Sequence, residues 1–199
     1  MKKICLPLDV SFTMTLTTAN AADFDKGLDA YNAGDFETAF VEFGELAEQG
    51  DADAQYYLGN MYYNGEGVEK NFTEAAKWFA FAAEQGDATA QLTLGIMYKY
   101  AEGVEQDYAY AAELYSLAAK QGDTHAQFNL GIMYENRTGV VQSYVVAHMW
   151  LNISVANGRE GAASERDWIA ANKLTRASII MAQELASICL ASNYGNCGY

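Results

Sequence analysis

Apolar and polar residues follow a pattern that repeats along the middle of the chain, from residue 55 to residue 126. Gln55 returns as Gln91 and Gly59 returns as Gly95, so each offset is 36 residues (91 − 55 and 95 − 59). Within one unit the apolar side chains recur near helical spacing. A fixed period of this size indicates a repeat array, in which each unit can bury its apolar face only against its neighbours.

Each unit contains two predicted helices joined by a glycine-rich loop. The first begins near Ala52, where Asp51 can cap it, and ends at residues 64–67, an Asn-Gly-Glu-Gly run suited to positive φ. The second opens at Asn71 and ends at Gly86. Helices of about a dozen residues are marginal alone in water, so packing between helix pairs must stabilise the array.

Glycine recurs in the middle of the first helix of each unit, as Gly59, Gly95 and Gly131. Glycine at such a position costs roughly 1 kcal/mol relative to alanine. Because the residue is kept three times in register, we expect a neighbouring helix to cross there and to leave no room for a Cβ atom.

The pattern predicts an all-α, right-handed solenoid of helix-turn-helix repeats with a helical C-terminal cap. The repeat units cover about 22–54, 55–90, 91–126 and 127–162, and the first unit has a shorter loop between its helices. Residues 163–199 form the predicted cap, with helices over about 163–174 and 176–190. We expect Trp168 and Ile169 to anchor the first of these, and the second to bury Ile179, Ile180, Leu185, Ile188 and Leu190.

Small, aromatic and glycine residues stand at fixed places in the unit, namely Gly59, Tyr62, Gly67, Val68, Ala75, Trp78, Ala82, Ala83 and Gly86. Together they resemble the Sel-one-like repeat, a branch of the tetratricopeptide-like superfamily. The third copy also matches, but it departs at residues 136–138 and at Arg159, which replaces the aspartate cap. The cap resembles the C-terminal extension of small exported bacterial members, which end in a helix and a short Cys-containing tail.

Residues 1–21 have the three parts of a secretory signal. Lys2 and Lys3 give a basic start, residues 4–16 are mostly apolar, and residues 19–21 form an Ala-Asn-Ala cleavage pattern. Cleavage before Ala22 would place the mature protein in the periplasm or outside the cell. The alternative is an uncleaved N-terminal arm, since Pro7 and Asp9 interrupt the apolar part.

Two cysteines remain after such cleavage, Cys189 and Cys197, with a turn-rich stretch between them. In an oxidising compartment they are expected to pair and to fasten the tail to the last helix. The rival interpretations are a metal site and a redox pair. Neither histidine is near in sequence and the spacing is not CxxC, so we expect no metal and no cofactor.

The net charge and the placement of the histidines argue against several classes of function. A formal net charge of −14 argues against nucleic acid and against anionic membranes as partners. His125 and His148 stand apart from any catalytic motif, so we do not expect an enzyme. Some Cys-rich relatives of the resembled family are associated with β-lactam binding or hydrolysis, but they carry a cysteine pair in each repeat. The three full units here contain none.

Positions on the first helix that vary between units are the candidate ligand-facing residues, because the concave face of such a stack is lined by these helices. Tyr57, Asn60 and Asn64 share one helix face at spacings of three and four. With their equivalents in the other units the set is Asp25, Leu28, Asn32, Tyr57, Asn60, Asn64, Thr93, Ile96, Tyr100, Asn129, Ile132 and Asn136.

The sequence therefore favours a monomeric, non-catalytic scaffold or adaptor of the cell envelope, with no transmembrane span, that binds a peptide segment of a protein partner. A factor that binds peptidoglycan or another glycan is the alternative, in which Tyr57 and Tyr100 would stack on sugars. A β-lactam-binding or β-lactam-hydrolysing enzyme is a weaker third hypothesis.

Overall fold

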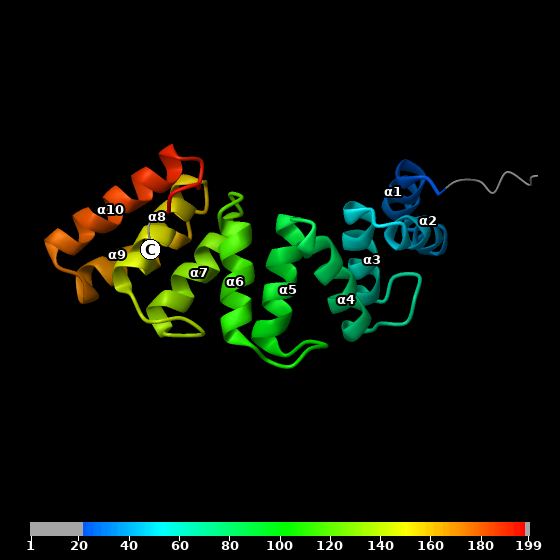
Figure 1. Ribbon diagram of the computed structural model, residues 1–199, viewed down its shortest axis with the longest axis horizontal. Helices are drawn as coiled ribbons and strands as arrows, with labels where there is room; N and C mark the ends of the chain where they lie inside the picture. The colour runs from blue at the N-terminus through cyan, green and yellow to red at the C-terminus, as the bar shows by residue number, and fades with distance from the viewer. Residues whose placement is uncertain (1–21, 198–199) are drawn as a thin grey trace, which may run out of the picture.

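The computed structural model describes residues 22–197. Within this range the chain forms ten helices and no strand, and the helices are stacked along one long axis (Figure 1). In chain order they are α1 (Phe24–Ala33), α2 (Phe36–Glu48), α3 (Ala52–Asn64), α4 (Phe72–Glu84), α5 (Ala88–Tyr100), α6 (Tyr108–Ala119), α7 (Thr124–Asn136), α8 (Tyr144–Ala156), α9 (Ala162–Lys173) and α10 (Arg176–Ala191).

Each helix packs against the next one along the chain as far as α9, which confirms the predicted all-α repeat solenoid. The pairs α3–α4, α5–α6 and α7–α8 are the three full repeats, and α1–α2 is the short first unit. The loops that follow α3, α5 and α7 lie along one edge of the stack, the lower edge in Figure 1. No helix within residues 22–197 is long and apolar enough to cross a membrane.

The helix ends follow the signals in the sequence. Asp51, Asp87 and Asp123 each accept a hydrogen bond from the backbone N–H three residues on, which caps α3, α5 and α7. Gly65 ends α3 with a φ of 80°. Ala101 ends α5 with a φ of 60°, so the left-handed conformation is kept even where the glycine is not.

The mid-helix glycines make room for a side chain of the paired helix. A Cβ atom on Gly59 would lie 2.8 Å from the ring of Phe79, and one on Gly95 would lie 2.7 Å from the ring of Tyr115. The expectation of a close approach is confirmed, and the group that approaches is a large side chain, since Phe79 and Tyr115 are both fully buried.

Buried glutamines tie successive repeats together. The side-chain Nε2 of Gln91 donates to the carbonyl oxygen of Ala83 at 3.1 Å, and its Oε1 accepts from Nε2 of Gln121 at 2.9 Å. The Gln91 side chain thus adds a second donor to a carbonyl at the end of the preceding second helix, which also accepts from the N–H of Gly86 at 3.0 Å. The same bond recurs at 3.1 Å between Gln55 and Ala47, and between Gln127 and Ala119.

The C-terminal cap differs from the expectation in its packing. α9 and α10 both pack against α8, and Ile169 anchors α9 in full burial as expected. The prediction was wrong for Trp168, Ile180 and Ile188, whose side chains are 47%, 47% and 48% exposed. α10 buries small residues such as Ala182, and Ile179, Leu185 and Leu190 are only partly buried.

The tail that follows α10 is closed by a disulfide between Cys189 and Cys197, as expected from the sequence. Both cysteines are buried. The predicted signal, residues 1–21, lies outside the residues that the structure describes.

Candidate protein-binding surfaces

The twelve candidate positions lie on α1, α3, α5 and α7, the first helix of each pair. None of the twelve side chains is fully buried. Tyr100 at the end of α5 is the most open large one, at 61% exposure, and the Lys99 ammonium lies 5.1 Å from the centre of its ring. The exposed members are Asp25, Asn32, Asn64, Tyr100 and Asn136.

Three polar members of the set are partly exposed. Asn60 donates to the carbonyl of Tyr56 at 3.2 Å, and Thr93 donates to the carbonyl of Thr89 at 2.8 Å. These bonds stay within their own helices, so a ligand could compete for both side chains. Asn129 is the third member of this group.

The apolar members take part in packing. Tyr57 stacks on Phe43 with ring centroids 4.8 Å apart and lies edge-on to Phe24 and Tyr31. This aromatic cluster joins the first two repeats. The ring of Tyr57, one of the two that would stack on sugars in a glycan-binding protein, is therefore engaged in packing. Leu28, Ile96 and Ile132 are likewise partly buried against hydrophobic clusters.

The loop edge of the stack is held by tyrosine–glutamate bonds. The hydroxyl of Tyr31 donates to Glu66 at 2.8 Å, and Tyr63 bonds Glu102 in the same way one repeat later. Burial, followed by the Glu66 carboxylate, raises the pKa of Tyr31 to about 12. The third loop has Thr138 at the glutamate position, so the series ends there.

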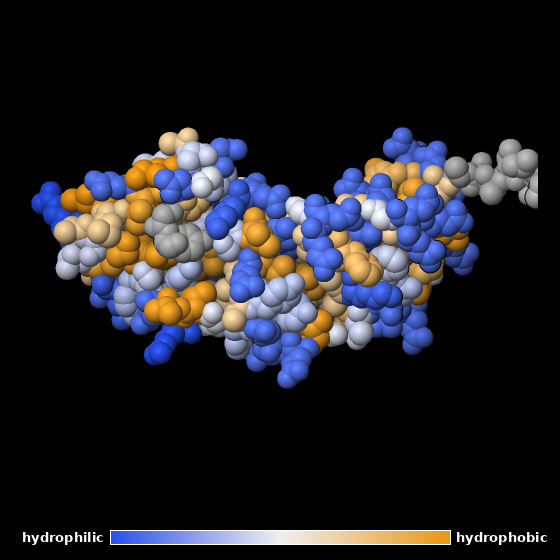
Figure 2. Space-filling view, viewed as in Figure 1, coloured by the Kyte–Doolittle hydropathy of each residue, from blue (hydrophilic) through white to orange (hydrophobic). Residues whose placement is uncertain are grey.

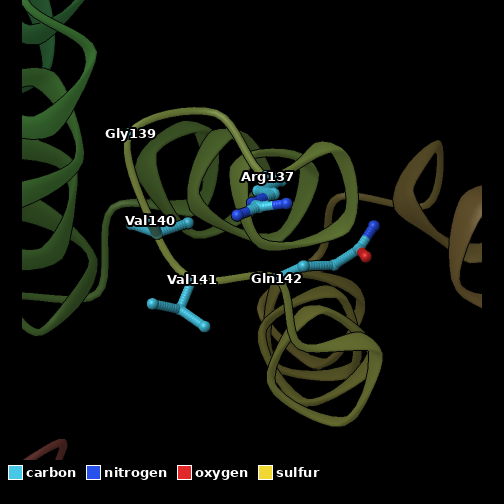
Figure 3. Close-up of a pocket in the computed structure, with 5 residues that line it drawn as sticks. All are labelled: Arg137, Gly139, Val140, Val141 and Gln142. Carbon is cyan, nitrogen blue, oxygen red and sulfur yellow. The ribbon is translucent and has the colours of Figure 1, made fainter.

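The third loop instead forms an open hollow of about 520 Å³ (Figure 3). Val141 points away from the loop into solvent and is 85% exposed. Arg137 begins the loop with a φ of 59°. This is the segment in which the third copy departs from the repeat pattern.

The two histidines lie in different environments. His148 on α8 is buried, and its Nδ1 lies 3.4 Å from Nδ2 of Asn152. The guanidinium of Arg166 donates to Oδ1 of the same asparagine. Burial, followed by the charge of Arg166, lowers the pKa of His148. His125 is exposed in the first turn of α7 beside Arg159. No group of three or more His, Cys, Asp or Glu side chains in residues 22–197 is arranged to hold a metal ion.

A second surface lies on the other helices of the repeats, and the sequence analysis missed it. A pocket of about 430 Å³ is lined by Gly50 after α2 and by Trp78 and Phe81 of α4. Trp78 packs against the hydrophobic cluster of the first repeat. Phe81 beside it is 41% exposed. We call this feature the Trp78 pocket.

These observations define a class of protein: an α-solenoid whose open surfaces suit binding. A protein-family model, the Sel1 repeat, matches residues 52–87, 88–123 and 124–158, and the chain belongs to this family. Sel1-repeat proteins generally mediate protein–protein interactions, and their fold is typically a non-catalytic scaffold.

Two solved structures are similar to the chain. The first is a Sel1 repeat protein from Oxalobacter formigenes, with a TM-score of 0.73 and 25% identity over 86% of this chain and 78% of that one. The second is c5321, a protective antigen of uropathogenic Escherichia coli with an SLR fold, with a TM-score of 0.51 and 27% identity. That match covers 86% of this chain but only 47% of the antigen. No curated protein sequence matches the chain.

Proposed function

We propose that this protein is a non-catalytic adaptor of the bacterial cell envelope that binds an extended peptide segment of a partner protein. The binding surface is the face formed by α1, α3, α5 and α7. Its polar core consists of Asn60, Asn64 and Asn129 together with the exposed ring of Tyr100. Amide side chains can donate to and accept from a peptide backbone, which suits them to this ligand.

One observation carries the proposal. The positions that hold the stack together are repeated between units, as with the buried Gln55, Gln91 and Gln127, whereas the candidate face changes from unit to unit. Asn64, Tyr100 and Asn136 stand at one repeat position and all three are exposed. In a solenoid that binds one partner, the residues that pack the repeats together stay the same from unit to unit, whereas the residues that contact the partner differ.

Export is part of the proposal, and two observations support it. A structural disulfide such as Cys189–Cys197 is typical of oxidising compartments. The similar antigen c5321 is described as a protective antigen, which is compatible with a location outside the cytoplasm. Intact mass spectrometry tests this part. Loss of residues 1–21 and a gain of about 2 Da on reduction are expected, whereas a full-length chain with free thiols would contradict it.

Site-specific photo-crosslinking in the native host tests the binding face. A photoreactive residue in place of Tyr100 should give a discrete adduct with a partner protein. The matched control is a photoreactive residue in place of Val141, which is more exposed but lies on the loop edge. Adducts at position 141 and none at position 100 would refute the proposed face.

A further inference from the structure

α10 and the tail that follows it fill a groove along α8. Ala186 and Cys189 of α10 and Cys197 of the tail are buried in one cluster with Trp150 and Ile153 of α8. Trp150 and Ile153 are both fully buried. Figure 2 shows hydrophobic residues gathered at this end of the molecule, over α8 and α10. We call this feature the Trp150 groove.

A tyrosine beyond the end of α10 completes the cover. The hydroxyl of Tyr194 accepts a hydrogen bond from Nδ2 of Asn157 at 2.7 Å. Its ring lies 3.6 Å from the place of a Cβ atom on Gly122, at the turn between two repeats. The Cys189–Cys197 disulfide closes the loop that carries Tyr194. The occupant of the groove is therefore a helix end with small side chains, followed by a closed turn with a tyrosine.

The Trp78 pocket is the same surface two repeats earlier in the chain. Both surfaces are formed by the second helix of a unit and by the turn that ends the unit before it. The corresponding residues are 72 apart (150 − 78), which is twice the repeat length, and the pairs are Gly50 and Gly122, Trp78 and Trp150, Phe81 and Ile153, and Gln85 and Asn157.

What differs between the two surfaces is their cover. Ile153 has no exposed surface, whereas its counterpart Phe81 is 41% exposed. Phe81 lies edge-on to Trp78, with ring centroids 5.6 Å apart, and the Lys77 ammonium lies 5.5 Å from the Trp78 ring. The Trp78 pocket thus has an aromatic surface equivalent to that of the Trp150 groove, but Phe81 within it is left exposed.

The intermediate copy lacks this floor. Leu114 of α6 stands where Trp78 and Trp150 stand, and it is buried. Leu117, the counterpart of Phe81, is 51% exposed. A tryptophan therefore marks only the first and third copies of the surface, and the third is the one that the chain fills by itself.

We propose that the Trp78 pocket binds the C-terminal end of an amphipathic helix of a partner protein. Small side chains of that helix would pack on Trp78 and Phe81, and a tyrosine just beyond its end would meet Gly50 and Gln85. The amide oxygen of Gln85 can accept a bond from the hydroxyl. The internal repeat supplies the reason, because the segment of residues 22–197 that covers the equivalent Trp150 groove is of this kind. This surface is separate from the proposed peptide-binding face.

A peptide with the sequence of residues 176–197, with its disulfide closed, is the probe. It is the segment that fills the Trp150 groove, so it should bind the intact protein at the Trp78 pocket. Fluorescence anisotropy of the labelled peptide measures the affinity. Phe81→Ser should weaken binding about tenfold, as expected for the loss of a large aromatic contact. Phe81 is partly exposed, so the fold should survive the change, and a circular dichroism melting curve checks it.

Leu117→Ser is the matched control, because it removes an apolar residue of similar exposure from the copy without a tryptophan. It should leave the affinity unchanged. Absence of peptide binding to the wild-type protein would overturn the inference. So would equal affinities of wild type and Phe81→Ser, since the peptide would then be displacing the chain's own α10. Self-association abolished by Phe81→Ser would identify a second copy as the occupant and would also overturn it. Crosslinking at position 100 is independent of each of these results.

Discussion

The close fit between the mid-helix glycines and the paired helices predicts a large effect of adding one methyl group. In Gly95→Ala the new Cβ atom would lie 2.7 Å and 2.9 Å from two carbon atoms of the Tyr115 ring. Tyr115 is fully buried among alanines and cannot move away without disturbing them. Overpacking of this kind costs about 1–3 kcal/mol. Alanine is intrinsically better in a helix by about 1 kcal/mol, so we expect a net loss of about 0–2 kcal/mol.

Gly44→Ala is the matched control for this prediction. Gly44 is also inside a helix, α2, but no atom lies within 4 Å of the place of its Cβ atom. The helix propensity alone should act there and raise the stability by about 1 kcal/mol. Urea denaturation followed by far-ultraviolet circular dichroism compares the two variants. If Gly95→Ala proved as stable as Gly44→Ala, the steric reason given for the repeated glycine would be refuted.

Three further predictions follow from contacts between and beyond the repeats. Gln91→Ala should lower the free energy of unfolding by about 1–2 kcal/mol because it removes the two hydrogen bonds of a buried side chain. The exposed Gln106→Ala should change it by less than about 0.5 kcal/mol in the same urea assay. Cys197→Ser should cost about 2.5 kcal/mol, the chain-entropy value for so short a loop, and an unchanged melting curve would contradict this. In the folded protein the pKa of Tyr31 is raised to about 12. The stability that Tyr31 contributes is therefore present below about pH 10 and is lost as the pH rises toward 12. Ultraviolet titration should show that Glu66→Gln lowers the pKa of Tyr31 only in part, because the burial of its ring remains.

The local features of the fold could be predicted from the sequence because they depend on neighbouring residues. The period of 36 residues, the aspartate caps and the turn glycines each act within one unit, and the structure contains them. The pairing of Cys189 with Cys197 was accessible for the same reason, since the two residues are close in sequence.

The cap could not be predicted in the same detail because its packing depends on distant residues. The apolar residues of α10 do not show which side meets α8, and the chain uses the side with Ala182 and Ala186. Ile180 and Ile188 are left in solvent as a result. Their spacing in the sequence is equally compatible with burial.

The candidate binding surfaces were predictable only in part. Variation between repeats identified the positions on α3 and α5, but it did not show that Tyr57 would stack on Phe43 of the previous unit. The Trp78 pocket had a signal that the sequence analysis did not use: tryptophan recurs after two units and not after one. Its meaning required the position of α10, which only the three-dimensional structure gives.

Side-chain footprinting of the protein in complex with its captured partner tests the central claim, that this solenoid binds a protein segment on the face of its first helices. Hydroxyl radicals should oxidise Tyr100 and Trp168 in the free protein, because both rings are exposed. We expect the partner to protect Tyr100 and to leave Trp168 at the far end of the array unchanged. Oxidation of Tyr100 that is the same with and without the partner would contradict the proposed binding face.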